Sequence, residues 1–145
     1  MTRYLLDTNL ISEAIKPRPS PMVLDWLGQQ SSSDLFIASF TIAEVWRGIL
    51  IKEPGRRKRD LETWFAGPDG PGVLFAGRTL SFDERAALEW ARITAENHLA
   101  GRPRGIADMI IAATALANDC TVVTLNERDF SGVVDFLNPL VGLKP

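Results

Sequence analysis

The sequence of 145 residues has little of what builds most redox and soft-metal sites, because it contains one cysteine and one histidine. A single cysteine, Cys120, excludes an intramolecular disulfide and a thiolate zinc site, and its place in an apolar run predicts that it is buried. A single histidine, His98, leaves no basis for a histidine-rich metal site. We expect His98 to lie in solvent at the end of a helix.

Long hydrophobic segments are also absent, although 46% of the residues are hydrophobic. No apolar run reaches the roughly 18 residues that a membrane-spanning helix needs. Asp7 interrupts the first apolar run where the centre of a secretory signal would have to continue. We therefore expect a protein without a membrane segment or an export signal, located in the cytoplasm.

Neither sign of charge is in large excess, because 16 basic residues stand against 18 acidic residues and the net charge is −2. Any nucleic-acid partner must therefore be held by a local basic patch rather than by the charge of the whole protein. The length is typical of one compact domain covering residues 1–145, and no internal repeat divides it.

Glycine and proline residues divide the chain into short segments that alternate between strand and helix patterns. Strands are predicted at residues 3–6, 34–39, 78–82, 121–125 and 133–136. Helices are predicted at residues 10–15 and 21–29, from a Thr41 cap to before Pro54, at 56–65, from an Asp83 cap to before Gly101, and at 106–118, with a surface loop at 66–77. This alternation predicts an α/β fold, a single three-layer domain with a short parallel sheet of about five strands and helices on both faces.

Acidic residues stand close to the ends of the predicted strands. Asp7 ends the first strand, Glu44 lies in the first turn of the helix after the second, Asp108 opens a buried helix, and Asp129 follows the fourth strand. Active groups gather beyond the carboxyl ends of parallel strands, so we expect these acids to share a cleft. Simpler interpretations exist: Asp7 and Asp108 are acceptable acids for helix N-termini, and Glu44 pairs with Thr41 in a Thr-x-x-Glu capping box.

A shared cleft of carboxylates points to a particular chemistry. Ionised carboxylates in a site of low dielectric constant are tolerable when a cation compensates their charge. Oxygen ligands without histidine or cysteine favour a hard cation such as Mg²⁺ or Mn²⁺. Such a cation lowers the pKa of a water and neutralises the charge that develops on a phosphodiester. The acids therefore predict metal-dependent hydrolysis of phosphodiester bonds.

Four segments, taken in their order and spacing, resemble the PIN-domain family of ribonucleases, and within it the VapC and FitB type toxins of toxin–antitoxin pairs. These segments are residues 5–9, 41–44, 107–115 and 124–130, and the resemblance spans nearly the whole chain. It implies a Mg²⁺-dependent endoribonuclease that acts as a toxin. It also implies that the protein is usually dimeric and is inhibited by a small antitoxin protein.

The resemblance further implies roles for individual residues. The acids that would act in catalysis are Asp7, Glu44, Asp108 and Asp129, of which the first three would bind the metal. The residues that would support them are Thr8, Asn9, Thr124 and Asn126. Some relatives place the fourth acid where Asn126 stands, and others use the acid beside the aromatic residue, which is Asp129. We predict that Asp129 is the fourth acid and that Asn126 contacts water or a ligand.

An acidic cleft repels RNA, so cations must neutralise the phosphates beside the bond that is cut. The predicted RNA contacts are Lys16, Arg56, Arg57, Arg59, Arg102 and Arg104. The dense basic run at 56–59 is alternatively a solvated helix face. We expect the substrate to be single-stranded or loop RNA, because its exposed backbone can enter a cleft.

Two other functions fit parts of this pattern. A phosphatase or phosphoacceptor domain would use Asp7 as the nucleophile, but the second acid expected two residues later is Asn9. A stable phosphate on Asp7 after incubation with a phosphodonor would favour that class. A non-catalytic module would keep the acids only to bind a metal or a partner protein, and a lack of RNA cleavage would favour it.

Overall fold

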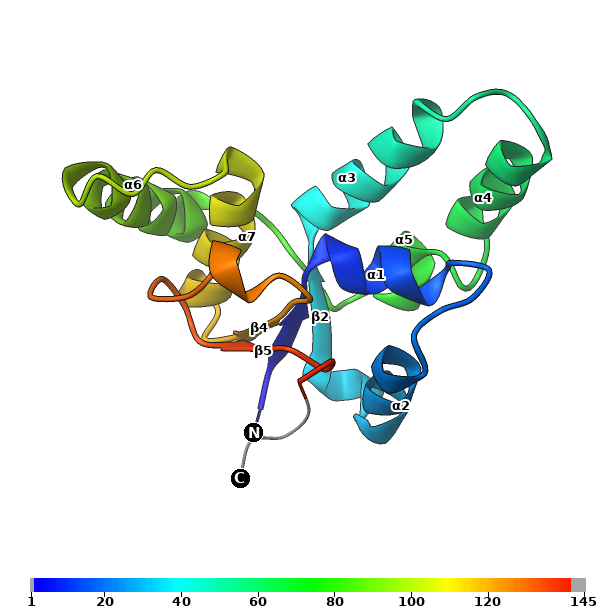
Figure 1. Ribbon diagram of the computed structural model, residues 1–145, viewed down its shortest axis with the longest axis horizontal. Helices are drawn as coiled ribbons and strands as arrows, with labels where there is room; N and C mark the ends of the chain where they lie inside the picture. The colour runs from blue at the N-terminus through cyan, green and yellow to red at the C-terminus, as the bar shows by residue number, and fades with distance from the viewer. Residues whose placement is uncertain (1, 142–145) are drawn as a thin grey trace.

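The computed structural model describes residues 2–141 as a five-stranded parallel sheet with helices on both faces (Figure 1). In chain order the elements are β1 (Tyr4–Leu6), α1 (Thr8–Ala14), α2 (Pro21–Gln29), η1 (Ser32–Asp34), β2 (Leu35–Ala38), α3 (Ser39–Leu50), α4 (Arg56–Ala66), α5 (Pro71–Leu74), β3 (Thr79–Leu80), α6 (Glu84–Leu99), α7 (Ile106–Ala117), β4 (Thr121–Val123), η2 (Glu127–Asp129) and β5 (Phe136–Leu137). The predicted three-layer α/β fold is confirmed.

The strand order is β3-β2-β1-β4-β5. The chain proceeds outward from β1 through β2 to β3, and then returns to place β4 on the other side of β1. There Leu5 pairs with Val122 and Leu6 with Val123. Such a reversal of direction leaves a crevice beyond the carboxyl ends of the two central strands, which is where α/β folds bind ligands.

Alternate residues of the central strands face two different cores. Leu5 and Val122 belong to a cluster with Ile93 of α6 and with α7, whereas Leu6 and Val123 belong to a cluster with α1 and α2. Figure 1 shows these two groups of helices on opposite sides of the sheet. Because both faces of the sheet are covered, the strands are continuous apolar runs rather than alternating ones.

A third apolar cluster joins α1, α3 and α4. Val45 and Ile49 of α3 pack with Leu61 of α4, and Trp46 stacks on Phe65 with ring centroids 4.6 Å apart. The apolar stripe predicted along the helix after the second strand is therefore a packing surface. It fixes α3 relative to α4 and to the end of α1.

The structure corrects the predicted start of α3. This helix begins at Ser39, directly after β2, so the predicted helix cap at Thr41 and its capping box with Glu44 are wrong. Thr41 is fully buried within the helix, and no side chain caps the N-terminus of α3. The helix starts early because β2 runs into it without an intervening turn.

Other boundaries also differ from the predictions. The segment 66–77, predicted as a loop, contains the short helix α5. Its first residue is Pro71, and proline is favoured at that position of a helix. The last strand is Phe136–Leu137 rather than 133–136, because Val133 and Val134 turn back to bond the carbonyl of Phe130. Within residues 2–141, every helix is too short or too polar to traverse a bilayer.

Candidate functional site

Asp7 lies at the reversal of the sheet, between the carboxyl ends of β1 and β4. The residue as a whole is 6% exposed. One carboxylate oxygen accepts a hydrogen bond from the backbone N–H of Thr8 at 2.8 Å, and the other accepts one from Thr124 Oγ1 at 2.9 Å. The first bond caps α1, which is why this helix begins at Thr8 rather than at residue 10. Asp7 is therefore fixed between two elements that are remote in sequence.

Thr124, the first residue after β4, connects two of the predicted site segments, residues 5–9 and 124–130. Its hydroxyl oxygen accepts hydrogen bonds from the backbone N–H of Asn126 at 3.0 Å and from Asn9 Nδ2 at 3.3 Å. Asn9 Oδ1 in turn accepts from the backbone N–H of Leu125 at 3.3 Å. These bonds join α1 to the segment after β4 and hold both beside Asp7.

Glu44 reaches the site from α3. Its Oε1 accepts a hydrogen bond from Thr8 Oγ1 at 2.6 Å, and that hydroxyl also lies 3.3 Å from Thr41 Oγ1. The half-buried Glu44 side chain is therefore turned toward the end of β1 and not into bulk solvent. The sequence reasoning missed Thr41 as a member of this site. A signal was present, since Thr41 and Glu44 are three residues apart and share a helix face.

Asp108 is the third residue of α7, and its carboxylate lies over the start of that helix. A Cβ atom added to Gly105 would lie 3.0 Å from Asp108 Oδ2, so the glycine leaves room for this close approach. The role of Gly105 was not predicted from the sequence. Its signal was a glycine at the helix cap three residues before a candidate acid.

Asp129, in η2, belongs to the same group of acids. Its carboxylate accepts a hydrogen bond from Asn126 Nδ2. Its negative charge also raises the pKa of Asp108. Asn126 and Asp129, between which the sequence left the fourth site residue open, are thus direct partners. The structure brings the four predicted acids close enough to repel one another. The negative charges of Asp129, Asp7 and Glu44 each contribute to the raised pKa of Asp108.

The cluster raises the proton affinity of two of its members. Burial raises the pKa of Asp7 from 3.8 to about 6, and the hydrogen bonds from Thr124 and Thr8 partly oppose this shift. Burial also raises the pKa of Asp108 to about 6, with a further contribution from the negative charge of Asp129. Without a compensating cation, the ionised cluster therefore destabilises the fold near neutral pH.

This electrostatic cost gives a pH-dependent stability. Between pH 3.8 and about pH 6, Asp7 is protonated in the folded protein and ionised in the unfolded chain. The free energy of unfolding of metal-free protein should therefore fall by about 3 kcal/mol on account of Asp7 as pH rises through this range, with a further fall from Asp108, and stay low above it. We expect urea denaturation in EDTA to show this fall for wild type and a smaller fall for Asp7→Asn. A constant difference between the two proteins at every pH would contradict the assignment.

The donor atoms suit a hydrated hard cation. Among residues 2–141, no three acidic, histidine or cysteine side chains converge closely enough to enclose a metal by themselves. Mg²⁺ needs no such enclosure, because it retains several waters and binds through one or two carboxylates plus substrate oxygens. The all-oxygen set around Asp7 and Asp108, with both pKa values raised, fits that mode of binding.

The predicted RNA contacts occupy two regions. Near α1 and α4, Lys16 forms an ion pair with Glu13 at 2.6 Å, and Arg57 Nη2 donates to the carbonyl oxygen of Ile15 at 3.0 Å. Arg56 lies 4.0 Å from Asp60 in an exposed pair. Arg59 and Arg102 are exposed on the surface. The sequence prediction for these cations stays a prediction.

Arg104 has a structural task as well. Its Nη1 donates to the carbonyl oxygen of Arg128 at 3.0 Å, and its Nη2 donates to that of Ser131 at 2.7 Å. These two carbonyls flank Asp129 in the chain. Arg104 therefore holds the loop that carries the fourth acid, and a contact between Arg104 and RNA remains a prediction.

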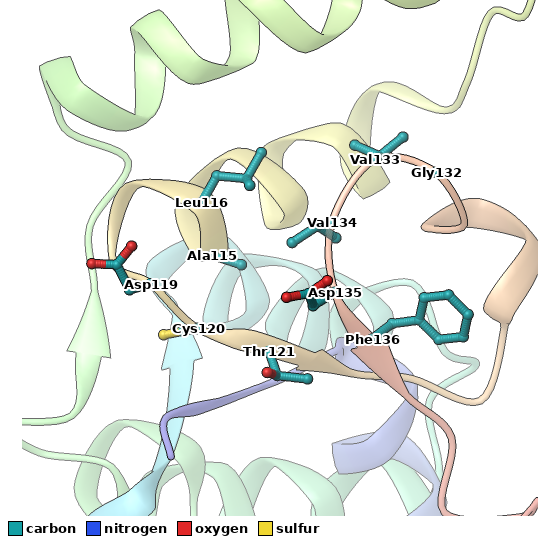
Figure 2. Close-up of a pocket in the computed structure, with 10 residues that line it drawn as sticks. All are labelled: Ala115, Leu116, Asp119, Cys120, Thr121, Gly132, Val133, Val134, Asp135 and Phe136. Carbon is teal, nitrogen blue, oxygen red and sulfur yellow. The ribbon is translucent and has the colours of Figure 1, made fainter. Parts of the chain in front are cut away.

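A cavity of about 800 Å³ lies at the other end of the strands (Figure 2). Figure 2 shows residues from the end of α7, the start of β4 and the loop before β5 around it, with Asp119 and Asp135 among them. None of the four clustered acids lines this cavity. Size alone therefore does not identify the functional site of this molecule.

Comparison with known proteins places this arrangement in a family. The model of the PIN domain matches residues 4–135. The chain belongs to the PIN-domain family. The matched range contains every acid of the cluster, from Asp7 to Asp129, together with Thr8, Thr124 and Asn126. The predicted resemblance to this family is thereby confirmed.

Relatives of this PIN-domain chain carry informative names. It is 36% identical to toxin FitB of Neisseria gonorrhoeae, covering 87% of this chain and 89% of that protein. It is 35% identical to a VapC ribonuclease of Sinorhizobium fredii, covering 93% of this chain and 96% of that protein. The crystal structure of FitAcB from Neisseria gonorrhoeae superposes with a TM-score of 0.88 at 35% identity, covering 94% of this chain and 98% of that one.

Proposed function

We propose that this PIN-domain protein is an endoribonuclease that hydrolyses RNA phosphodiester bonds with Mg²⁺, for which Mn²⁺ can substitute. The observation that carries the proposal is the group of four acids held together beyond the carboxyl ends of the sheet, with Asp7 bonded to Thr124 and Glu44 bonded to Thr8. The relative named as a VapC ribonuclease supports the reaction class.

The proposed mechanism assigns a task to each acid. Asp7 and Asp108, assisted by Glu44, would hold the cation. When bound, Mg²⁺ supplies positive charge that stabilises the developing negative charge on the phosphate and lowers the pKa of a water. Thr124 and Thr8 fix the orientations of Asp7 and Glu44 through the 2.9 Å and 2.6 Å hydrogen bonds, so little reorganisation is needed during the reaction. Asp129 would accept a proton from the attacking water.

Metal dependence tests this proposal directly. Purified protein, freed of any bound antitoxin, is expected to cleave single-stranded RNA in Mg²⁺ or Mn²⁺ and to lose cleavage in EDTA. Activity should return when excess Mg²⁺ is added to the EDTA sample, and gel electrophoresis of a 5′-labelled RNA would measure both steps. Cleavage that persists unchanged in EDTA would overturn the metal mechanism.

The proposed biological role is that of the toxin in a toxin–antitoxin pair. The relative named toxin FitB supports this role. The natural partners would be a small cognate antitoxin protein and the cellular RNA in the cytoplasm, and the active assembly would be a homodimer. Co-expression with the neighbouring gene product, followed by co-purification and loss of RNA cleavage, would test the antitoxin assignment.

The alternative function is a non-catalytic module whose acids bind only a metal or a partner. The raised pKa values of Asp7 and Asp108 are compatible with cation binding in either function. Two measurements on one preparation distinguish the two functions. A non-catalytic module would bind Mg²⁺, as detected by calorimetry, and would leave every tested RNA intact.

A further inference from the structure

A second cavity, of about 260 Å³, begins at Glu44 and extends away from the acids between α1, α3 and α4. Its apolar lining includes the buried side chains of Val45, Ile49 and Leu61, which belong to the third hydrophobic cluster. The volume is below the range of typical pockets for drug-sized ligands, about 300–1,000 Å³, and so suits a small group. The cavity adjoins the acid cluster and is not part of it.

Three cations line this cavity: Lys16, Lys52 and Arg57. They come from three separate segments, at the ends of α1 and α3 and in the first turn of α4. Arg57 is held in place by its 3.0 Å hydrogen bond to the carbonyl oxygen of Ile15. A planar guanidinium fixed in this way is suited to binding phosphate oxygens. Glu44 is the single acid among the lining residues, and Glu13 pairs with Lys16 at 2.6 Å. Lys52 and Arg57 therefore supply the positive charge of the cavity that no ion pair within residues 2–141 compensates.

Cations in the first turn of α4 are unfavourable for the helix itself. The N-terminus of a helix carries partial positive charge, which opposes basic residues such as Arg57. The first turn of α4 contains no acidic residue, and no side chain caps it. A bound anion would relieve this repulsion.

Gly48 keeps the cavity open. It lies in α3 midway between Glu44 and Lys52, four residues from each, and all three line the cavity. A glycine inside a helix is destabilising relative to alanine. Packing does not require it here, since a Cβ atom added at this position would meet nothing within 4 Å. A glycine at position 48 therefore lowers the stability of α3 without being needed for packing. A ligand that occupies the space beside it would account for the glycine.

We propose that the cavity lined by Lys16, Lys52 and Arg57 binds a backbone phosphate of the RNA strand, beside the bond placed at the acids. This inference rests on the proposed nuclease function. It adds the path of the RNA strand, which would run from the acid cluster along α3 toward α4. An RNA phosphate is favoured over other anions because the cavity is continuous with Glu44, where the same strand would be cut. The cations offset the repulsion between the acids and the RNA backbone.

The test measures binding of a fluorescein-labelled single-stranded RNA to the full chain carrying Asp108→Asn, in Mg²⁺, at several salt concentrations. Lys52→Gln and Arg57→Gln should each lower the slope of log affinity against log salt by about 0.7, the value for one phosphate contact on a single strand, which weakens binding about fivefold at 0.1 M salt. Arg85→Gln, which removes an exposed cation from α6, is the matched control and should change neither quantity.

Gly48→Glu and Gly48→Gln provide a second pair at a position where an added Cβ atom meets nothing within 4 Å. They are similar in size and differ in charge, so Gly48→Glu should bind RNA several-fold more weakly than Gly48→Gln. Wild-type affinity and slope in Lys52→Gln and Arg57→Gln, in a preparation whose wild type cuts RNA, would overturn the cavity assignment alone. A wild type that neither binds nor cuts RNA would overturn the nuclease function. Loss of antitoxin binding with unchanged RNA binding would assign the cavity to an acidic peptide instead.

Discussion

Asp108→Asn is expected to fold normally and to cleave RNA about a thousandfold more slowly than the wild type in saturating Mg²⁺. The substitution keeps the size of the side chain and removes the charge that would hold the cation. Asp108 lies at the start of α7 beside Gly105, so an amide fits the same space without a new clash. Initial rates on a 5′-labelled RNA, with circular dichroism to verify folding, measure the effect.

Asp135→Asn is the matched control for this variant. Asp135 is an exposed acid at the other end of the strands, beside the 800 Å³ cavity, and its loss removes the same charge from the protein. Cleavage by Asp135→Asn should equal that of the wild type. Wild-type cleavage by Asp108→Asn would remove Asp108 from the proposed metal ligands.

Gly70→Ala is expected to have the largest effect on stability, lowering the free energy of unfolding by about 3 kcal/mol. A Cβ atom at this position would lie 2.1 Å from the carbonyl oxygen of Phe65 and 2.7 Å from that of Trp64. Both neighbours are backbone atoms at the end of α4, so they cannot rotate away as a side chain would. Urea denaturation followed by tryptophan fluorescence would measure the loss.

Gly72→Ala tests whether the clash, rather than the loss of a flexible residue, causes that effect. Gly72 lies two residues later, inside α5, and a Cβ atom there would meet nothing within 4 Å. We expect the free energy of unfolding of the Gly72→Ala variant to be equal to or slightly above that of the wild type. Equal stability of Gly70→Ala and wild type would show that the end of α4 moves to make room.

The sequence was sufficient to predict the sheet and the membership of the acid group. Apolar runs that are buried on both faces, separated by helical stretches, predict a parallel sheet, and parallel strands bring their carboxyl ends to one edge. Asp7 and Asp108 could therefore be placed at that edge from their positions after a strand and at the start of a helix. Periodicity was less informative for Glu44, because its orientation depends on a hydrogen bond to Thr8 from another helix.

What the sequence did not reveal are contacts between remote segments. Thr41 was predicted as a helix cap because threonine often has that role, but β2 enters α3 without a turn and buries it. Arg104 was predicted as an RNA contact from its charge, whereas its hydrogen bonds to the loop of Asp129 depend on the packing of α7 against β4. Local patterns carry no information about which backbone carbonyl a long side chain will reach.

The hydrogen bond from Thr124 to Asp7 spans 117 positions of the chain. A growing polypeptide holds Asp7 from the start of its synthesis but lacks the hydroxyl that orients it until β4 has left the ribosome. A chain that ends before residue 124 would keep Asp7 without the hydroxyl that fixes its orientation, so the proposed ribonuclease site is complete only when the segment after β4 is present.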